Sequence, residues 1–241
     1  DPWVSDPVTN VPDELRTTPA QPVAALALLR RRDFRNVYLA VAASEFGDSL
    51  HYIALMWFAF DAAGPLGVVA VRLADSVPAI VFGLHGGLAA DRADRRRLMI
   101  GADLVRAGVL VPIAVAGLVG HLPLAALVAA AFVLETATSY FAPAYGALLP
   151  ALVERENVQQ ANALVQGTAQ ALSVVGWAAA AGLVAALPIS TFFAVNATSF
   201  ALSALLIARV RIHRADGGTH TADLRLRDGF AALRPRPELA V

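Results

Sequence analysis

Residues 87–97 read GLAADRADRRR, a short charged run that separates two long apolar segments. The flanking segments, residues 66–90 and 98–119, each hold about 20 mostly apolar residues, which is enough to cross a hydrocarbon core as a helix. Arginine-rich connections stay on the cytoplasmic side of a membrane. The stretch therefore predicts a helical hairpin that crosses a bilayer twice, with its connection in the cytoplasm.

The rest of the chain extends this pattern. The sequence is 57% hydrophobic and 16% charged, whereas soluble domains average about 45–50% apolar and about 25% charged residues. Lipid offers no partner for backbone N–H and C=O groups, so the spans should be helices. We predict an all-α membrane protein with six transmembrane helices at 37–60, 66–90, 98–119, 123–149, 161–187 and 189–210.

The arginines predict how the chain is oriented. They gather before the first span at 30–35, between the second and third at 92–97, at Arg155, and after the sixth from 209 to 236. The other three connections carry no arginine. Because basic residues collect on the cytoplasmic side, both termini are expected to be cytoplasmic.

The same pattern divides the chain into three parts. Residues 1–29 are polar and proline-bearing at first, which is typical of a disordered tail, with a short interfacial segment before the first arginines. Residues 30–210 form the predicted six-helix bundle. Residues 211–241 are charged and interrupted by prolines, so we expect a cytoplasmic linker toward a missing second bundle.

Several ionisable residues fall inside the predicted spans, where a charge costs about 2.5–3.5 kcal/mol at the bilayer centre. Arg72 and Asp75 are three residues apart and share a helix face, as do Asp103 and Arg106. Each pair could neutralise itself locally. A structural ion pair is therefore at least as good a reading as a functional site.

The remaining acids are the candidate coupling residues. Glu45, Asp48 and Tyr52 share one face of the first span, and Glu135 lies near the middle of the fourth. Burial disfavours the charged form of an acid, so such groups can bind and release protons. The alternatives are packing of a protonated acid or pairing with an arginine from another span. His51 is expected to pack or to line a cavity rather than to bind a ligand.

Small residues spaced four apart predict where helices approach each other closely. Gly83 and Gly87 form a G-x-x-x-G pair in the second span. Pairs of this kind let two helix backbones come together. We therefore predict that Gly83 and Gly87 lie at a helix contact.

The charged run also resembles the signature loop of the major facilitator superfamily, G-x-x-x-D-[RK]-x-G-[RK]-[RK]. The matching residues are Gly87, Asp91, Arg92, Arg95 and Arg96, with Asp94 in place of the second glycine. We expect Gly87 to permit close packing at the helix end. Asp91 could pair with arginines or cap a helix N-terminus, and the arginines should hold the loop at the cytoplasmic face.

Other segments are similar to one branch of that superfamily, the efflux transporters that include macrolide and enterobactin exporters. They are residues 44–48, 102–107, 141–143, 160–164, 196–200 and 227–234. One departure is in the fifth span, where Trp177 follows Gly176 at the position of a family proline. The resemblance implies a 3+3 inverted repeat, one half of a twelve-helix protein that works by alternating access.

The function that the resemblance implies is secondary active transport, with proton-coupled efflux of a small amphipathic molecule or drug. The partners would be the lipid bilayer, the substrate, protons, and a second six-helix bundle from the rest of the chain or another subunit. The location would be a bacterial plasma membrane. Alternatives are a non-transporting six-helix interaction or assembly subunit, or a half-transporter that works as a dimer.

Other classes of function lack their sequence signatures. The chain has no cysteine and none of the motifs H-E-x-x-H, G-x-S-x-G or G-x-x-x-x-G-K-[ST], which mark metal-dependent hydrolysis, serine hydrolysis and nucleotide binding. We therefore expect no enzyme activity, no cofactor, no metal and no nucleic-acid partner.

Overall fold

A computed structural model describes residues 22–120 and 122–211, and every regular element in this part is helical. The elements are α1 (Pro22–Ala27), η2 (Leu28–Arg30), α2 (Arg32–Arg92), α3 (Arg95–Leu118), α4 (Leu124–Leu148), η3 (Leu149–Ala151), η4 (Arg155–Asn157), α5 (Val158–Leu183) and α6 (Ile189–Ala208). The predicted tail before residue 22 and the linker after residue 211 lie outside the described residues.

The helix α2 contains a sharp reversal that divides it into two arms. Ala63 and Gly64 leave helical geometry, and Gly64 has φ +61°. The next residue, Pro65, lacks a backbone N–H and disfavours helical geometry in the residue before it. A Cβ on Gly67 would lie 2.0 Å from the carbonyl oxygen of Ala59, so the arms meet directly after the reversal. This Gly-Pro turn makes the first two helical segments antiparallel neighbours.

The helical segments coincide with most of the predicted ranges. By length and composition, α2, α3, residues 124–151 and α6 could cross a membrane. The helix α5 is long enough but is not among these candidates in the described part of the chain. It carries several polar residues, including Gln159, Asn162 and Gln166. The predicted fifth span also extended too far, because α5 ends at Leu183 and the chain then turns.

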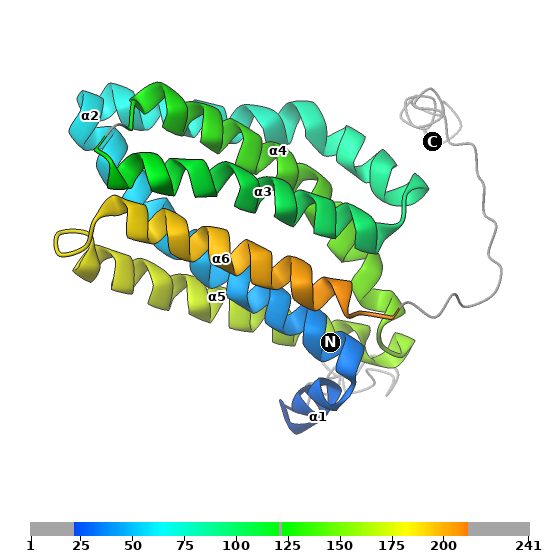
Figure 1. The fold of residues 1–241 in the computed structure, drawn as a ribbon. Helices are drawn as coiled ribbons and strands as arrows, with labels where there is room; N and C mark the ends of the chain where they lie inside the picture. The colour runs from blue at the N-terminus through cyan, green and yellow to red at the C-terminus, as the bar shows by residue number, and fades with distance from the viewer. Residues whose placement is uncertain (1–21, 121, 212–241) are drawn as a thin grey trace, which may run out of the picture. The chain divides into compact units, whose positions relative to one another are not determined.

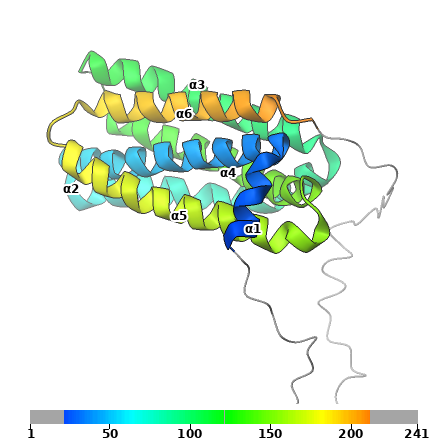
Figure 2. The same cartoon turned by 90° about the horizontal axis from the view of Figure 1, so that it is seen from below.

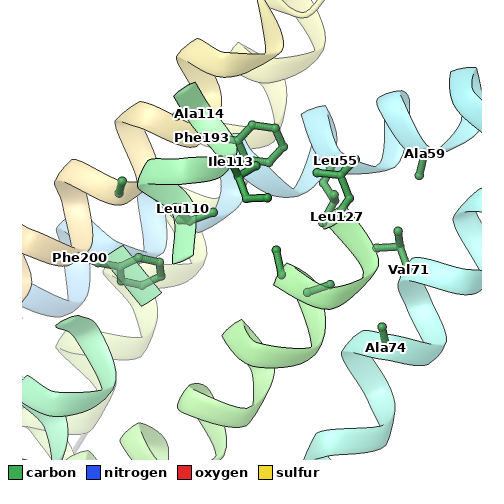
Figure 3. Packing of buried hydrophobic residues seen from close by; sticks show 13 residues of the cluster. Leu55, Ala59, Val71, Ala74, Leu110, Ile113, Ala114, Leu127, Phe193 and Phe200 are labelled. Atoms are coloured by element: carbon green, nitrogen blue, oxygen red, sulfur yellow. The ribbon is translucent and has the colours of Figure 1, made fainter. Parts of the chain in front are cut away.

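The helices pack side by side into one bundle (Figure 1). The arms of α2 contact α4, α5 and α6, while α3 packs against α4 and α6. The short helix α1 lies against α5, as the view from below shows (Figure 2). At the centre, Leu55, Leu110, Leu127, Phe193 and Phe200 form part of a buried apolar cluster drawn from α2, α3, α4 and α6 (Figure 3).

Much of the outer surface of this bundle is apolar, unlike that of a soluble protein, and some polar groups are buried. Large apolar side chains are exposed, such as Ile80 at 82% and Leu66 at 77%. Charged and amide groups are buried, such as Asp103 and Asn196 at 0%. Apolar surface of this extent needs a lipid surrounding, whereas the buried polar groups must find partners inside the bundle.

The predicted glycine contact lies at a different residue. A Cβ on Gly83 or Gly87 would meet nothing within 4 Å among the described residues. A Cβ on Gly86 would instead lie 1.9 Å from the carbonyl oxygen of Ser139 in α4. The prediction for Gly83 and Gly87 was therefore wrong for this bundle, because the helix is rotated so that Gly86 faces its neighbour.

Alanine substitutions at these glycines should separate the effect of helix packing on stability from the effect of helix propensity. We expect Gly86→Ala to lower thermal stability in detergent, because the new methyl group overpacks the α2–α4 contact at a cost of about 1–3 kcal/mol. Gly83→Ala is the matched control in the same helical arm and should be neutral or slightly stabilising. Equal melting temperatures for the two variants would contradict the contact at Gly86.

Candidate functional site

A cavity of about 200 Å³ lies in the bundle between both arms of α2, α3, α4 and α6. Polar groups on its wall come from Asp48, His51, Tyr52, Asp75, Arg106, Glu135 and Thr138. Its apolar wall includes Leu55, Met56 and Phe200. Asp48, Arg106 and Glu135 each lie near the middle of their helical segments, so the polar side of the cavity is far from both ends of the bundle.

Asp48 is held by an amide rather than by an arginine. Its carboxylate accepts a hydrogen bond of 3.0 Å from the Asn196 side chain in α6. Gly47 allows this approach, because a Cβ there would lie 2.6 Å from the Asn196 oxygen and 2.3 Å from the Ser199 hydroxyl. At Gly47 the helices α2 and α6 approach closely, and the next residue, Asp48, places its carboxylate beside Asn196 of α6.

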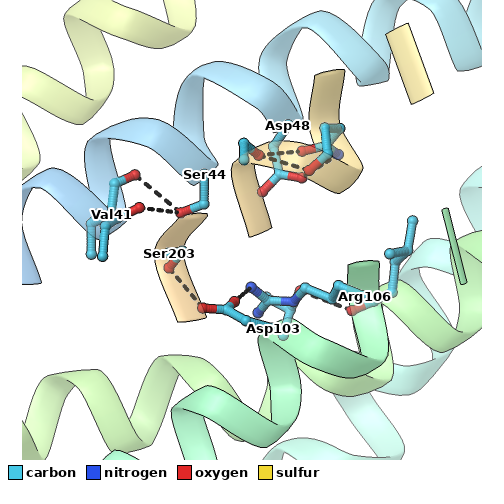
Figure 4. A network of polar contacts seen from close by, with 11 residues as sticks. Val41, Ser44, Asp48, Asp103, Arg106 and Ser203 are labelled. Atoms are coloured by element: carbon cyan, nitrogen blue, oxygen red, sulfur yellow. Dashed lines mark hydrogen bonds and ion pairs between the residues drawn. The ribbon is translucent and has the colours of Figure 1, made fainter. Parts of the chain in front are cut away.

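Asp103 and Arg106 form a buried ion pair within α3. Arg106 donates to Asp103 over 3.0 Å, and the Ser203 hydroxyl donates to the other Asp103 oxygen over 2.7 Å (Figure 4). The two charged side chains are only 4% and 0% exposed. The Arg106 guanidinium lies 4.7 Å from the Phe141 ring centre and 4.9 Å from that of Phe200, within cation–π range.

Arg106 also has one nitrogen without a partner in the described part of the chain, and it lines the cavity. Its Nε atom is buried and has no hydrogen-bond partner among the described residues. Buried donors without partners are uncommon, because each forfeits its interaction with water. Arg106 is therefore the positive group on a wall that also carries Asp48, Asp75 and Glu135.

The second local pair is more open. Arg72 donates to Asp75 over 2.6 Å, and the two side chains are 47% and 35% exposed. The Arg72 guanidinium also lies 5.7 Å from the ring centre of Tyr52 on the other arm of α2. This pair therefore joins the two arms, and Asp75 reaches the cavity while Arg72 does not line it.

Glu45 lies outside the cavity, although it is one turn before Asp48. Its carboxylate accepts a hydrogen bond of 2.6 Å from Ser173 in α5. Close packing of α5 supports this contact, because a Cβ on Gly176 would lie 2.6 Å from the Cβ of Ser49. The helical rotation between Glu45 and Asp48 is sufficient to direct the two acids toward different neighbours.

Glu135 lines the cavity from α4. Its carboxylate has no hydrogen bond or ion pair within the described ranges. Thr138 lines the same cavity, and its hydroxyl donates back to its own helix at Leu134. His51 packs its ring against Phe193, with the ring centres 5.1 Å apart. Glu135 is thus the cavity acid with the fewest competing contacts.

The signature loop holds helix ends together. Arg95 donates to the carbonyl of Ala147 over 3.0 Å, near the end of α4. Arg96 donates to the carbonyl of Ile207 over 3.1 Å and also to that of Ala208, at the end of α6. Carbonyl groups at helix C-termini lack intrahelical donors and attract cations. The loop therefore caps two helices that are distant in sequence.

The acids of the loop have roles different from those predicted. Asp94 is the N-cap of α3, and its carboxylate accepts from the backbone N–H of Arg97 over 3.1 Å. Asp91 and Arg92 are exposed and form no side-chain bond within the described part of the chain. The helix cap predicted for Asp91 is thus supplied by Asp94, which stands where the family pattern has glycine.

Several functional neighbours are not evident in the sequence. Asn196, Ser203 and Ser173 are polar residues in apolar helices, and each binds one of the predicted acids. An amide residue within an otherwise apolar span is a sequence signal that could have identified Asn196. No sequence signal shows that the rings of Phe141 and Phe200 both contact the Arg106 guanidinium. Within the described ranges, no group of His, Asp and Glu could hold a metal ion.

Exposed apolar helices around a cavity with charged groups on its wall are typical of a multi-pass membrane protein. The family model for a transmembrane secretion effector matches residues 23–233. The chain therefore belongs to this efflux-type family of the major facilitator superfamily.

Individual relatives agree with that assignment. The chain is 28% identical to the MFS-type transporter YkuC of Bacillus subtilis over 187 residues. The match covers 77% of this chain and 43% of YkuC. Macrolide efflux protein A of Streptococcus pyogenes is 24% identical over 206 residues, covering 83% and 51%. The chain thus spans about half the length of these relatives. No solved structure gives a significant match.

The buried pair should behave as one unit in stability measurements. We expect Arg106→Leu to lower stability by about 3–5 kcal/mol, because it leaves the Asp103 carboxylate buried without its counter-charge. The double variant Arg106→Leu, Asp103→Asn should recover part of this loss. Thermal melting in detergent measures both variants, and a double variant no more stable than the single one would contradict the coupling.

Proposed function

We propose that this chain is the N-terminal six-helix bundle of a proton-coupled efflux transporter in a bacterial plasma membrane. The two arms of α2 with α3, α4, α5 and α6 would supply six crossings. The arginines at 30–35, 92–97, 155 and 209–211 support a cytoplasmic location for both ends of the bundle. A second bundle would complete the protein, and the two would alternate access around a site between them.

The observation that carries this proposal is the mid-helix cavity with acids from two separate helices. Asp48 in α2 and Glu135 in α4 line it together, and Arg106 supplies the only arginine on its wall among the described residues. A buried carboxylate is most stable when neutral, whereas a nearby guanidinium favours its ionised form. A change in the distance to Arg106 during alternating access would therefore alter proton affinity at Asp48 and Glu135.

The other candidate residues would support this cycle. Glu45 would contribute by holding α5, because its carboxylate accepts a hydrogen bond from Ser173 and it does not line the cavity. Tyr52 and the Arg72–Asp75 pair would hold the two arms of α2 at the cavity mouth. In the signature loop, exposed Asp91 and Arg92 would be available to the second bundle.

The side chains of the cavity wall support one class of substrate. Apolar side chains such as Leu55, Met56 and Phe200 alternate with acids on the wall, which suits a small amphipathic molecule with an apolar body. The name of one relative, macrolide efflux protein A, supports a substrate of this kind. We propose export of a small amphipathic compound or drug.

Proton coupling is tested with the intact gene product reconstituted into vesicles. We expect Asp48→Asn and Glu135→Gln each to abolish substrate-dependent proton flux, because neither amide can bind and release a proton at the cavity. Flux is measured with a pH-sensitive dye inside the vesicles while candidate amphipathic compounds are added.

Two exposed acids away from the cavity provide matched controls. Asp61→Asn and Glu156→Gln make the same chemical changes outside the cavity and should keep the flux of the unaltered protein. Full proton flux in the Asp48→Asn variant would remove Asp48 from the mechanism. No flux in the unaltered protein with any compound would count against transport.

A further inference from the structure

A second hollow in the bundle lies outside the cavity described above, between α3 and α4. It has a volume of about 320 Å³. Its floor includes Ala102 and Ala137, which are each 7% exposed. From α3 it is lined by Leu98, Gly101 and Val105. The groove is almost entirely apolar and opens on the outer surface of the two helices.

The opposite wall comes from α4 and runs antiparallel to α3. Val133, Thr136 and Tyr140 line it. The Thr136 hydroxyl donates to its own helix at Phe132 and adds no free polar group. The Tyr140 hydroxyl has no hydrogen-bond partner among the described residues. It lies toward the arginine-bearing end of the groove, because Tyr140 is the lining residue closest to the end of α4.

Arg97 marks that end of the groove. Its neighbours Arg95 and Arg96 are bound to helix carbonyls. The Arg97 side chain is 84% exposed, and its contact is Nε to an Asp94 oxygen at 3.9 Å. The two terminal nitrogens of Arg97 remain without a partner in the described structure. The groove therefore has a cationic group at its mouth, whose contact with Asp94 is long at 3.9 Å, and an apolar interior.

We propose that this groove binds one molecule of an anionic phospholipid. Its phosphate would lie on Arg97, the Tyr140 hydroxyl would donate to an ester oxygen, and an acyl chain would lie along Gly101 and Val105. The distance along α3 from Arg97 to Val105 is about 12 Å at the helical rise. One leaflet of the hydrocarbon core is about 15 Å thick, so the groove matches the depth of a single leaflet.

The chemistry of both parts supports this occupant. Basic pockets between membrane helices bind anionic head groups. Gly101 leaves the groove open, since a Cβ there would meet nothing within 4 Å. A bilayer presents acyl chains to any exposed apolar groove, and Arg97 selects among lipids by charge. The site depends on the membrane location of the chain but not on proton coupling or on the exported substrate.

Native mass spectrometry of the detergent-purified intact protein tests the site. The probes are phosphatidylglycerol and phosphatidylcholine with identical acyl chains, added in equal amounts. We expect the first to be retained about fivefold better, the factor that one basic residue near a membrane surface contributes. Arg97→Gln should abolish this preference, and Gly101→Leu should reduce retention of both lipids by filling the groove.

Each variant has a matched control. Gly83→Leu places the same side chain on α2 at another glycine with open space, and this residue does not line the groove. Arg155→Gln removes an exposed arginine that does not line it. Both should retain lipid as the unaltered protein does, and circular dichroism checks that every variant is folded.

Two results would overturn the proposal. Equal retention of the two lipids by the unaltered protein would show that Arg97 does not select an anionic head group. Retention by Gly101→Leu at the level of Gly83→Leu would show that bound lipid lies elsewhere.

Discussion

The ion pair between Asp103 and Arg106 is the interaction on which the centre of the bundle depends. Neither charge could remain in an apolar surrounding without the other, because each would carry a large desolvation cost. Ser203 of α6 satisfies the second carboxylate oxygen, and Phe141 and Phe200 cover the guanidinium from α4 and α6. The pair thus fixes three helices relative to one another at mid-depth.

The same pair gives the cavity its electrostatic character. Because one face of Arg106 is bound to Asp103 while its Nε is free of a described partner, a single guanidinium is both a structural element and part of the cavity wall. Asp48 is held in place by Asn196, and Glu135 is not held by any described hydrogen bond. Asp48 and Glu135 therefore differ in how strongly the bundle restrains their carboxylates.

At one end of the bundle, arginines organise the structure in a different way. Arg95 and Arg96 bind free carbonyls where α4 and α6 end, and Asp94 caps the start of α3. Arg211 donates its backbone N–H to Asp33 over 3.0 Å, which ties the end of α6 to the start of α2. Because each contact satisfies a helix terminus, the charged residues at this end stabilise the bundle.

Local patterns in the sequence were enough to predict the membrane class, the helical segments and the family. Hydropathy over about 20 residues, loop charge and three-residue spacing all depend on neighbours along the chain. They predicted a break between the spans 37–60 and 66–90, and they put Asp103 and Arg106 on one helix face. They also placed Asp48, Tyr52 and Glu135 among the candidate residues, which line one cavity in the structure.

Only the tertiary structure decided which face of each helix meets which neighbour. It placed Gly86 rather than Gly87 at the α2–α4 contact, turned Glu45 toward Ser173 and gave Asp48 an amide partner. In a soluble protein, the apolar face of a helix shows which side is buried. A membrane helix is apolar both toward lipid and toward its neighbours, so its rotation is set by packing that a single sequence does not display.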